Sequence, residues 1–437
     1  MVETLAIDAA RTPRWTAAAR IAFRFSVVYF GTYVLLTQML SSLLMPPFDN
    51  APGVGELPPF RTVVEWTAMH VFRVTTPLVV TGSGSGDKTF DWVQAFCLLA
   101  SAIVVAAAWS LLDRRRARYE RADAWFRLFL RFALGSTMVT YGVAKVVPLQ
   151  MGSVSLTRLI EPYGQFSPMG VLWAFIAASS PYQIATGAAE LIAGVLLFVP
   201  RTATLGAIVA LADAVQVFML NMTYDVPVKL LSFHLIVISI VLLAPHARRI
   251  ADVLLLGRPT GPAVEPPLGR TPRRRRLLVA AQVVFGVYIV VMNLYGARKA
   301  WYEFGGGAPE SALHGIWTVE TMAIDGVTRA PLVTDWGRWR RVVFDSRGRV
   351  TFQRMDDSFV GYTAQWYETL NTLTLTRGGE SGSVATFKVT RPAREEMTLA
   401  GTMEDHRVEM RLQLYDRRRF LLGSRGFHWV QEYPFNR

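Results

Sequence analysis

The sequence predicts a polytopic α-helical membrane protein of about seven transmembrane helices, followed by a small antiparallel all-β barrel or sandwich domain. Three observations predict it: long apolar segments, arginine clusters that alternate with them, and a period-two pattern after the glycines at 305–307. Only 18% of the 437 residues are charged, whereas an average soluble chain has about a quarter. We therefore expect the lipid bilayer to be the main environment of this chain.

Seven segments are long and apolar enough to cross a membrane. About 20 helical residues, each rising about 1.5 Å, cross a hydrocarbon core of about 30 Å. The expected spans are residues 25–44, 92–112, 126–147, 182–199, 203–220, 230–245 and 277–294.

Two of the connections between these spans are long. The first, 46–91, holds an amphipathic stretch at 62–74 and a Gly-Ser turn at 82–86, which we expect to be flexible. In the second, 148–181, the apolar run 171–178 is too short to span and is expected to be interfacial or re-entrant.

The distribution of basic residues predicts the orientation. Of the net charge of +13, residues 1–307 contribute +11 and residues 308–437 contribute +2. A nucleic-acid-binding protein would carry its basic patch on the soluble part, so that class is disfavoured. The arginine clusters before the first span, after the second, after the fourth and after the sixth all fall on one side. The positive-inside rule then predicts the N-terminus inside and the β-domain outside.

These patterns divide the chain into four parts. Residues 1–123 form an N-terminal tail and two accessory spans with a long outside loop, and residues 124–250 form a four-helix membrane core. Residues 251–304 form a basic cytoplasmic linker and the seventh span, and residues 305–437 form the extracytoplasmic β-rich domain.

Short alternating segments predict the strands of the β-domain. Residues 340–344 and 349–354 flank Asp345-Ser346-Arg347-Gly348 and indicate a hairpin. Further strands are expected at 373–376, 383–390, 397–403, 407–414 and 419–422, giving eight or so in all. Gly315-Ile316-Trp317 resembles the G-x-W opening of lipocalin-type barrels.

Ionisable side chains inside the expected spans are the first candidates for a site, because each costs about 2.5–3.5 kcal/mol to insert. Glu190 lies about 12 Å from the start of its span at Tyr182 and Asp213 about 15 Å from the start of its span at Ala203, both close to the midplane. Lys145 and His234 lie in the outer third. We expect Lys145, Glu190 and His234 to be catalytic, and the ligand to be bound by Tyr141, Gln150, Asp213, Asn221, Tyr224, Asp225 and Lys229.

Structural roles remain open for the same residues. Lys145 and Glu190 would then be a buried ion pair that holds two helices in register. His234 would be a hydrogen-bonded packing residue, and Tyr141 an interfacial anchor. In favour of function, the chain has 41 arginines but only five lysines, at positions 88, 145, 229, 299 and 388. Lysine is a compact point charge that can exchange a proton or form a Schiff base.

The sequence gives no sign of a metal centre. Cys97 is the only cysteine, and the six histidines lack the spacing of metal ligands. Redox chemistry would therefore need an organic cofactor, a metal on other ligands or a redox partner. The cofactor is unknown, and a quinone is the candidate we consider.

Several short motifs resemble those of the DoxX-like membrane proteins over about residues 124–250. They are Arg131, Gly142-Val-Ala-Lys145, Glu190-Leu-Ile-Ala-Gly194, Arg201-Thr202 and Asn221. The string 221–235 resembles a bacterial branch with extra helices and a β-tail, which implies a bacterial-type cytoplasmic (inner) membrane. The chain departs from the family at 244–249, where Ala-Pro-His-Ala-Arg-Arg replaces the glycine-rich segment that usually follows the fourth core helix. A weaker similarity joins it to the vitamin-K-dependent carboxylases, which also combine a helical unit with an outside β-rich part.

The resemblance implies a role near redox systems, because DoxX relatives include subunits tied to sulfur-compound or quinone-linked systems. Our first hypothesis is a membrane oxidoreductase component that binds a quinone or lipidic molecule and works with a soluble redox partner. The alternative is a non-enzymatic envelope protein, with the barrel as a lipid or small-molecule carrier or the whole chain as a scaffold. Whether the chain is an enzyme stays open.

Overall fold

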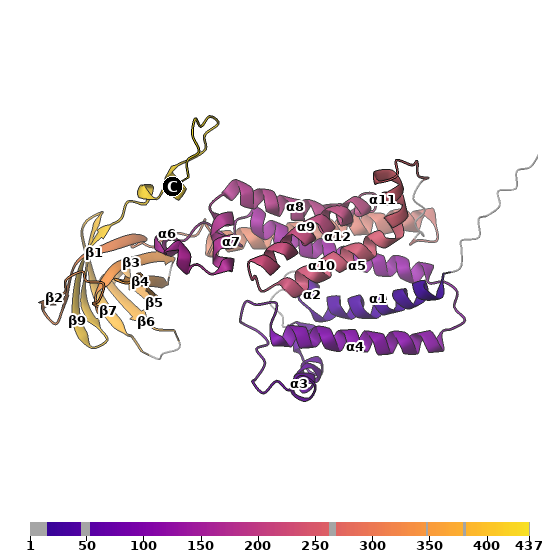
Figure 1. Cartoon of the computed structure of the whole chain (residues 1–437), viewed down its shortest axis with the longest axis horizontal. Coiled ribbons are helices and arrows are strands. Elements are labelled where there is room, and N and C mark those ends of the chain that lie inside the picture. The colour runs from indigo at the N-terminus through magenta and orange to yellow at the C-terminus, as the bar shows by residue number, and fades with distance from the viewer. Residues whose placement is uncertain (1–14, 45–52, 262–267, 347, 379–381, 437) are drawn as a thin grey trace, which may run out of the picture. The chain divides into compact units, whose positions relative to one another are not determined.

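The chain divides into two units in the computed structural model, which describes residues 15–44, 53–261, 268–346, 348–378 and 382–436. The helical unit comprises residues 1–147 and 183–300, and the barrel unit comprises residues 148–182 and 301–437. Figure 1 labels the helices and strands of both units.

Among the described residues, six helices are long and apolar enough to cross a membrane, which confirms the polytopic helical part. They are α1 (Ala17–Leu36), α4 (Thr89–Leu112), α8 (Ser180–Phe198), α9 (Ala203–Thr223), α10 (Lys229–Leu243) with its continuation, and α12 (Pro272–Glu303). The remaining expected span is α5 (Glu120–Val146), which has 27 residues but charged first turns. From Leu130 onward α5 is largely buried by its neighbours, so its surroundings are protein rather than lipid.

The predicted bounds of the first span, 25–44, are wrong at both ends. Helix α1 begins at Ala17, where the side chain of Thr16 accepts a hydrogen bond from the N–H of Ala19. It ends at Leu36, and Met39–Leu44 forms a separate short helix, α2. Arg24 thus lies inside α1, and its buried guanidinium donates to the Tyr119 hydroxyl at 2.8 Å and to the Asp113 carbonyl at 2.7 Å.

Shorter helices fill the connections of the helical unit. The amphipathic stretch is α3 (Phe60–His70), preceded by the 3₁₀ helix η1 (Val54–Glu56), and α10 continues through η3 (Ala244–His246) into α11 (Ala247–Leu254). We call the end of the unit where α5 begins the arginine end, since Arg201 and Arg248 follow helices that finish there. The end where α5 finishes is the loop end.

The Gly-Ser turn at the loop end was expected to be flexible, but backbone and side-chain hydrogen bonds anchor its last part. The N–H of Gly86 donates to the Pro227 carbonyl at 2.8 Å. The Asp87 carboxylate accepts from the N–H groups of Lys229 at 2.7 Å and Leu230 at 2.9 Å. Helix α10 has no side-chain cap at Val228, so Asp87 supplies one from a distant part of the chain.

The barrel unit contains a closed antiparallel barrel, which confirms the predicted β-domain. Strand β1 pairs with both β3 and β9, so eight strands close on themselves and β2 extends β1 alone. The strands are β1 (Gly315–Ile324), β2 (Val327–Thr328), β3 (Trp339–Ser346), β4 (Arg349–Arg354), β5 (Phe359–Tyr367), β6 (Thr372–Thr376), β7 (Ala385–Ala393), β8 (Glu396–Met403) and β9 (His406–Leu414).

The strands differ from the sequence prediction in two respects. Strands β1, β2 and β5 lie outside the predicted ranges, and residues 419–422 are not a strand but lie at η5 (Arg417–Arg419) and α13 (Leu421–Ser424). The pairing of β1 with β9 explains the second difference, because a closed barrel leaves no free edge for a further strand.

Side chains fill the interior of the barrel. Alternate residues point inward, and Phe352, Leu375, Phe387 and Met410 are fully buried there. Trp317 of the G-x-W motif joins this core and donates its indole N–H to the Leu313 carbonyl at 2.9 Å. Eight strands leave just enough room for side chains, so the barrel core is packed rather than hollow.

The long connection before α8 packs on the outside of this barrel. Helix α6 (Leu156–Ile160) covers β1 and β3, where Leu156, Ile316 and Val343 form a buried cluster. The 3₁₀ helix η2 (Tyr163–Gln165) and the apolar α7 (Pro168–Ala177) follow. With ten residues α7 is too short to span, and its interfacial or re-entrant position stays a prediction.

His406 has a partner that the sequence did not indicate. Its Nδ1 lies 2.7 Å from Oδ2 of Asp325, and the N–H of Arg407 donates to Oδ1 at 2.9 Å. The hydrogen bond from His406, helped by that from Arg407, lowers the pKa of the exposed Asp325 carboxyl.

Gly401 provides a test of the barrel packing. A Cβ at this position of β8 would lie 2.0 Å from the Thr386 carbonyl oxygen and 2.9 Å from Cα of Phe387. We expect Gly401→Ala to destabilise the barrel by about 1–3 kcal/mol, because the strands must move apart. Gly361→Ala on β5 is the control, since nothing lies within 4 Å of its Cβ. Thermal unfolding of the full-length protein measures both, and equal effects would contradict the β7–β8 packing.

Candidate functional site

Lys145 of α5 and Glu190 of α8 form a buried ion pair in the helical unit. The Lys145 Nζ lies 2.6 Å from both carboxylate oxygens. The two side chains are 10% and 6% exposed. Since an isolated charge is costly in this environment, each group depends on the other to remain ionised.

Glycines allow the two helices to approach closely enough for this pair. A Cβ at Gly142 would lie 2.6 Å from the backbone N of Leu191, and one at Gly187 would lie 2.6 Å from Cβ of Lys145. The contact is therefore backbone against backbone. The two helices run antiparallel, so Lys145 lies opposite Gly187, Glu190 lies one turn from Gly187 toward Gly142, and the pair belongs to this contact.

Two further side chains interact with the pair. The Lys145 Nζ lies 5.7 Å from the ring centre of Tyr141, which is within range of a cation–π interaction. Asp213 of α9 is half-buried and interacts electrostatically with Glu190 and Lys145. Four of the residues singled out from the sequence, Lys145, Glu190, Tyr141 and Asp213, therefore lie near one another, whereas His234 does not join them.

Gln183 is a polar residue of this region that the sequence analysis missed. It is fully buried on α8, and neither its amide oxygen nor its nitrogen has a hydrogen-bond partner among the described residues. It precedes Glu190 by seven residues and so lies on the same helix face, toward the loop end. Buried amides are rarely left unpaired, so a water molecule or a ligand atom is expected beside Gln183.

A cavity of about 540 Å³ opens at the loop end of the helical unit. This volume is in the range of small-molecule sites, about 300–1,000 Å³. Tyr141 lines this cavity, and its ring also lies within cation–π range of the Lys145 ammonium. The other polar lining residues are Tyr33, Thr37, Gln38, Ser41, Glu56, Ser85, Lys88, Asp91 and Gln94.

The residues predicted at the α9–α10 connection form a separate cluster. Asn221 donates to Ser232 Oγ at 3.0 Å and to the Val228 carbonyl at 3.3 Å. Asp225, with a φ of 50°, pairs with Lys229 at 2.9 Å. Tyr224 is the C-cap of α9. These contacts stabilise the turn, and it is Val228, Leu230 and Leu231 that line the cavity.

His234 is fully hydrogen-bonded in the core of the helical unit. Its Nδ1 lies 2.7 Å from the Leu230 carbonyl and its Nε2 lies 2.8 Å from the Tyr29 hydroxyl. A carbonyl can only accept, so Nδ1 carries the proton and the neutral ring accepts from Tyr29 at Nε2. The ring stacks on Tyr33 at 3.7 Å. This geometry fits a packing role, with Tyr33 linking it to the cavity wall.

The last predicted residue, Gln150, belongs to the barrel unit. Its amide oxygen is buried and accepts no hydrogen bond from the described residues. Within the described ranges, no group of three or more His, Cys, Asp or Glu side chains is arranged to hold a metal ion.

Comparison with known proteins gives one relative. The chain is 35% identical over 139 residues to the uncharacterized protein YwoB of Bacillus subtilis (strain 168), which covers 32% of this chain and 86% of YwoB. The chain belongs to the YwoB family. No family model matches it, and no solved structure does. The similarity to YwoB extends over a third of the chain.

A double-mutant comparison tests the ion pair. Lys145→Met leaves the Glu190 carboxylate buried and unpaired, and we expect it to cost about 3–5 kcal/mol of stability. Lys145→Met combined with Glu190→Leu should recover most of this loss, because no charge remains. Lys299→Met, at an exposed lysine of α12, is the control. Thermal unfolding in detergent measures the wild type, these three variants and Glu190→Leu alone, and a double-variant loss equal to the sum of the Lys145→Met and Glu190→Leu losses would show that the side chains do not meet.

Proposed function

We propose that the helical unit binds the polar head of a quinone or a related lipidic molecule beside Lys145 and Glu190, as a component of a membrane oxidoreductase system. One observation carries the proposal: the buried ion pair contacts Tyr141, and Tyr141 lines a cavity of about 540 Å³. Buried ionisable groups inside a membrane protein mark ligand or proton sites more often than not.

Gln183 gives this proposal independent support. Its two amide atoms have no partner among the described residues, which favours a hydrogen-bonding molecule on the face of α8 that carries Glu190. A ligand hydroxyl group beside Gln183 would accept from the amide nitrogen and donate to the amide oxygen. The amide, the ammonium and the phenol would together bind oxygen atoms of such a head group.

The chemistry assigned to each residue follows from its type. Lys145 is a donor with three N–H groups, so it can bind a ligand oxygen while it remains paired with Glu190. A bound quinone would supply two-electron, two-proton redox chemistry. The electrons would come from a soluble redox partner. Lys145 would pass one proton at a time to the ligand, and water in the cavity would supply both protons and restore the charge that pairs with Glu190.

The DoxX-like motifs support the same site. Gly142 and Lys145 of one motif, with Glu190 of the other, form the α5–α8 contact and its ion pair. With the orientation inferred from the arginine clusters, the loop end and its cavity would face outward from a bacterial cytoplasmic membrane. The Asp225–Lys229 turn would border the entrance, and we propose no catalytic step for His234.

The packed barrel interior disfavours the carrier function considered from the sequence. Its inward-facing side chains, such as Phe352 and Phe387, are fully buried against one another. A lipid would have to displace this core. If the chain is a non-enzymatic lipid-binding protein, the cavity of the helical unit is the better place for the lipid.

Mass spectrometry of the lipids that remain with the mild-detergent-purified protein tests the proposal. The wild type should retain a quinone, and the Lys145→Met, Glu190→Leu variant should retain less of this quinone by a factor of about ten or more. Hydrogen bonds to charged groups contribute about 1.5–3 kcal/mol, which corresponds to this factor. Lys299→Met should match the wild type.

Equal quinone retention by the wild type and the double variant would contradict the site. A phospholipid in place of a quinone, lost in the double variant, would keep the site but replace the oxidoreductase proposal with the lipid-binding alternative.

A further inference from the structure

The chain continues past the barrel into a segment with exposed aromatic side chains. We call residues 415–437 the C-terminal segment, which the structure describes as far as Asn436. After η5 and α13 its described residues form no helix or strand, and Figure 1 shows it leading away from the barrel strands. Four of its large apolar side chains are mostly exposed: Phe427 by 76%, Trp429 by 91%, Val430 by 77% and Tyr433 by 85%. Such a group of exposed apolar side chains marks a contact with a protein or a membrane.

The C-terminal segment starts at the end of the barrel where the chain arrives from the membrane helices. Leu414, the last residue of β9, pairs with Trp317 near the start of β1. Strand β1 begins at Gly315, twelve residues after α12 ends at Glu303. Twelve residues span at most about 40 Å, so this end of the barrel lies within that distance of the end of α12. Phe420 also packs beside α6, which belongs to the connection between α5 and α8. The segment is therefore long enough to reach the bilayer surface.

Positive charge predominates in the same segment. Its side chains include five arginines and two carboxylates, so their net charge is +3. Three of the arginines are consecutive, at 417–419. Arg418 pairs with Asp416 at 3.1 Å, whereas the Arg425 guanidinium donates to the neutral amide oxygen of Gln431 at 2.9 Å. The carboxylates of the segment thus offset part of its positive charge, and an anionic surface would complement the rest.

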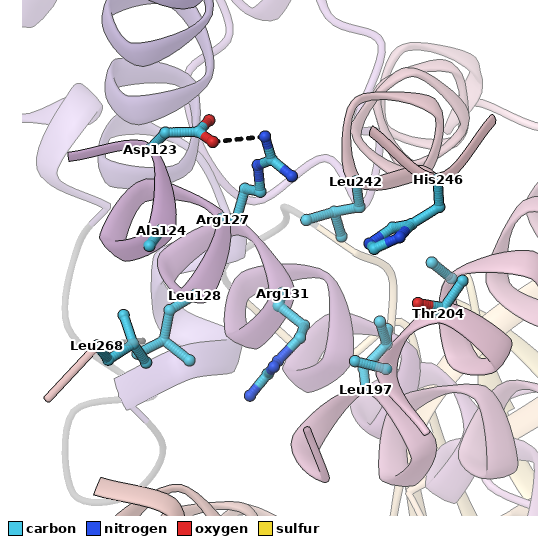
Figure 2. A pocket seen from close by; sticks show the side chains of 12 residues that line it. Asp123, Ala124, Arg127, Leu128, Arg131, Leu197, Thr204, Leu242, His246 and Leu268 are labelled. Carbon is cyan, nitrogen blue, oxygen red and sulfur yellow. Dashed lines mark hydrogen bonds and ion pairs between the residues drawn. The ribbon is translucent and has the colours of Figure 1, made fainter. Parts of the chain in front are cut away.

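The basic residues at the arginine end of the helical unit are a different case. Figure 2 shows Arg127 of α5 directed at the Asp123 carboxylate, beside a second, smaller cavity of about 100 Å³. Because both residues belong to the helical unit, these two charges offset each other within the protein. In the C-terminal segment the arginines outnumber the carboxylates, so the segment does not neutralise its own charge.

The combination of aromatic and basic side chains favours a lipid surface over a soluble protein. Tryptophan and tyrosine concentrate at the membrane–water interface, because their rings are apolar while their N–H and O–H groups stay hydrated. Arginines near a membrane surface are attracted by anionic head groups. The helices already hold the segment close to the bilayer, so its effective concentration there is high and a weak affinity is enough. A soluble partner has no such advantage.

We infer that the C-terminal segment docks on the anionic surface of the same bilayer that the helices cross. Trp429 and Tyr433 lie at the level of the head groups, Phe427 and Val430 point toward the acyl chains, and the arginines contact lipid phosphates. The docked segment gives the barrel a further attachment to the membrane, besides its connections to the helices. The inference does not depend on the proposed quinone site.

Spin labelling of the full-length protein tests the inference, because Cys97 is the single cysteine. In a Cys97→Ser background, a nitroxide at His428→Cys reports on the exposed aromatic residues. A nitroxide at Thr402→Cys is the control, at an exposed position of β8 near the opposite end of the barrel. The collision rate of the His428→Cys label with a water-soluble nickel chelate should be several-fold lower in phosphatidylglycerol nanodiscs than in phosphatidylcholine nanodiscs. High salt should reverse this difference, and the control label should show none.

Loss of the aromatic side chains provides the second readout. Trp429→Ala with Tyr433→Ala should return the His428→Cys label to its value in phosphatidylcholine, whereas Trp336→Ala, at an exposed tryptophan of the barrel unit, should not. Equal collision rates in the two lipids, or protection that survives loss of Trp429 and Tyr433, would overturn the inference. Protection only in discs that hold two copies of the protein would assign the segment to a contact between copies, and would overturn the lipid surface as its partner.

Discussion

The contact between the backbones of α5 and α8 is the constraint on which the helical unit depends. Gly142 and Gly187 leave no room for a side chain at this contact, and the two helices therefore meet at their main chains. At this separation the Lys145 ammonium reaches both oxygens of Glu190. The ion pair in turn makes the buried charges tolerable in the membrane part. The glycines and the charges of the two motifs are thus parts of one interaction.

The two ends of the helical unit have different chemistry because different segments close them. At the loop end, the Asp87 carboxylate binds the start of α10 and brings the 84–86 turn to the wall of the large cavity. Tyr141 joins that wall to the ion pair. At the arginine end, α5 begins with Asp123, Arg127 and Arg131 beside an uncapped helix start.

The sequence predicted the elements of this fold and the central ion pair, since both depend on local patterns. Hydropathy located the spans, period-two alternation located most strands, and the cost of buried charge singled out Lys145 and Glu190. The sequence could not predict contacts between distant segments: Asp87 caps a helix whose first N–H groups lie 142 and 143 residues further on. The same limit hid the Asp325–His406 pair and the separation of the predicted site residues into clusters around Lys145, Asn221 and His234. Gln183 could have been recognised from the sequence, because it is an amide side chain on the same face of the expected helix as Glu190.

An electron cryo-microscopy map of the full-length protein in a lipid nanodisc would test the central claim most directly. The account predicts α5 and α8 in backbone contact at Gly142 and Gly187, with Lys145 and Glu190 paired and non-protein density beside Gln183 and Tyr141. Helices separated by side chains or lipid at these glycines, with Lys145 and Glu190 directed to different partners, would contradict it.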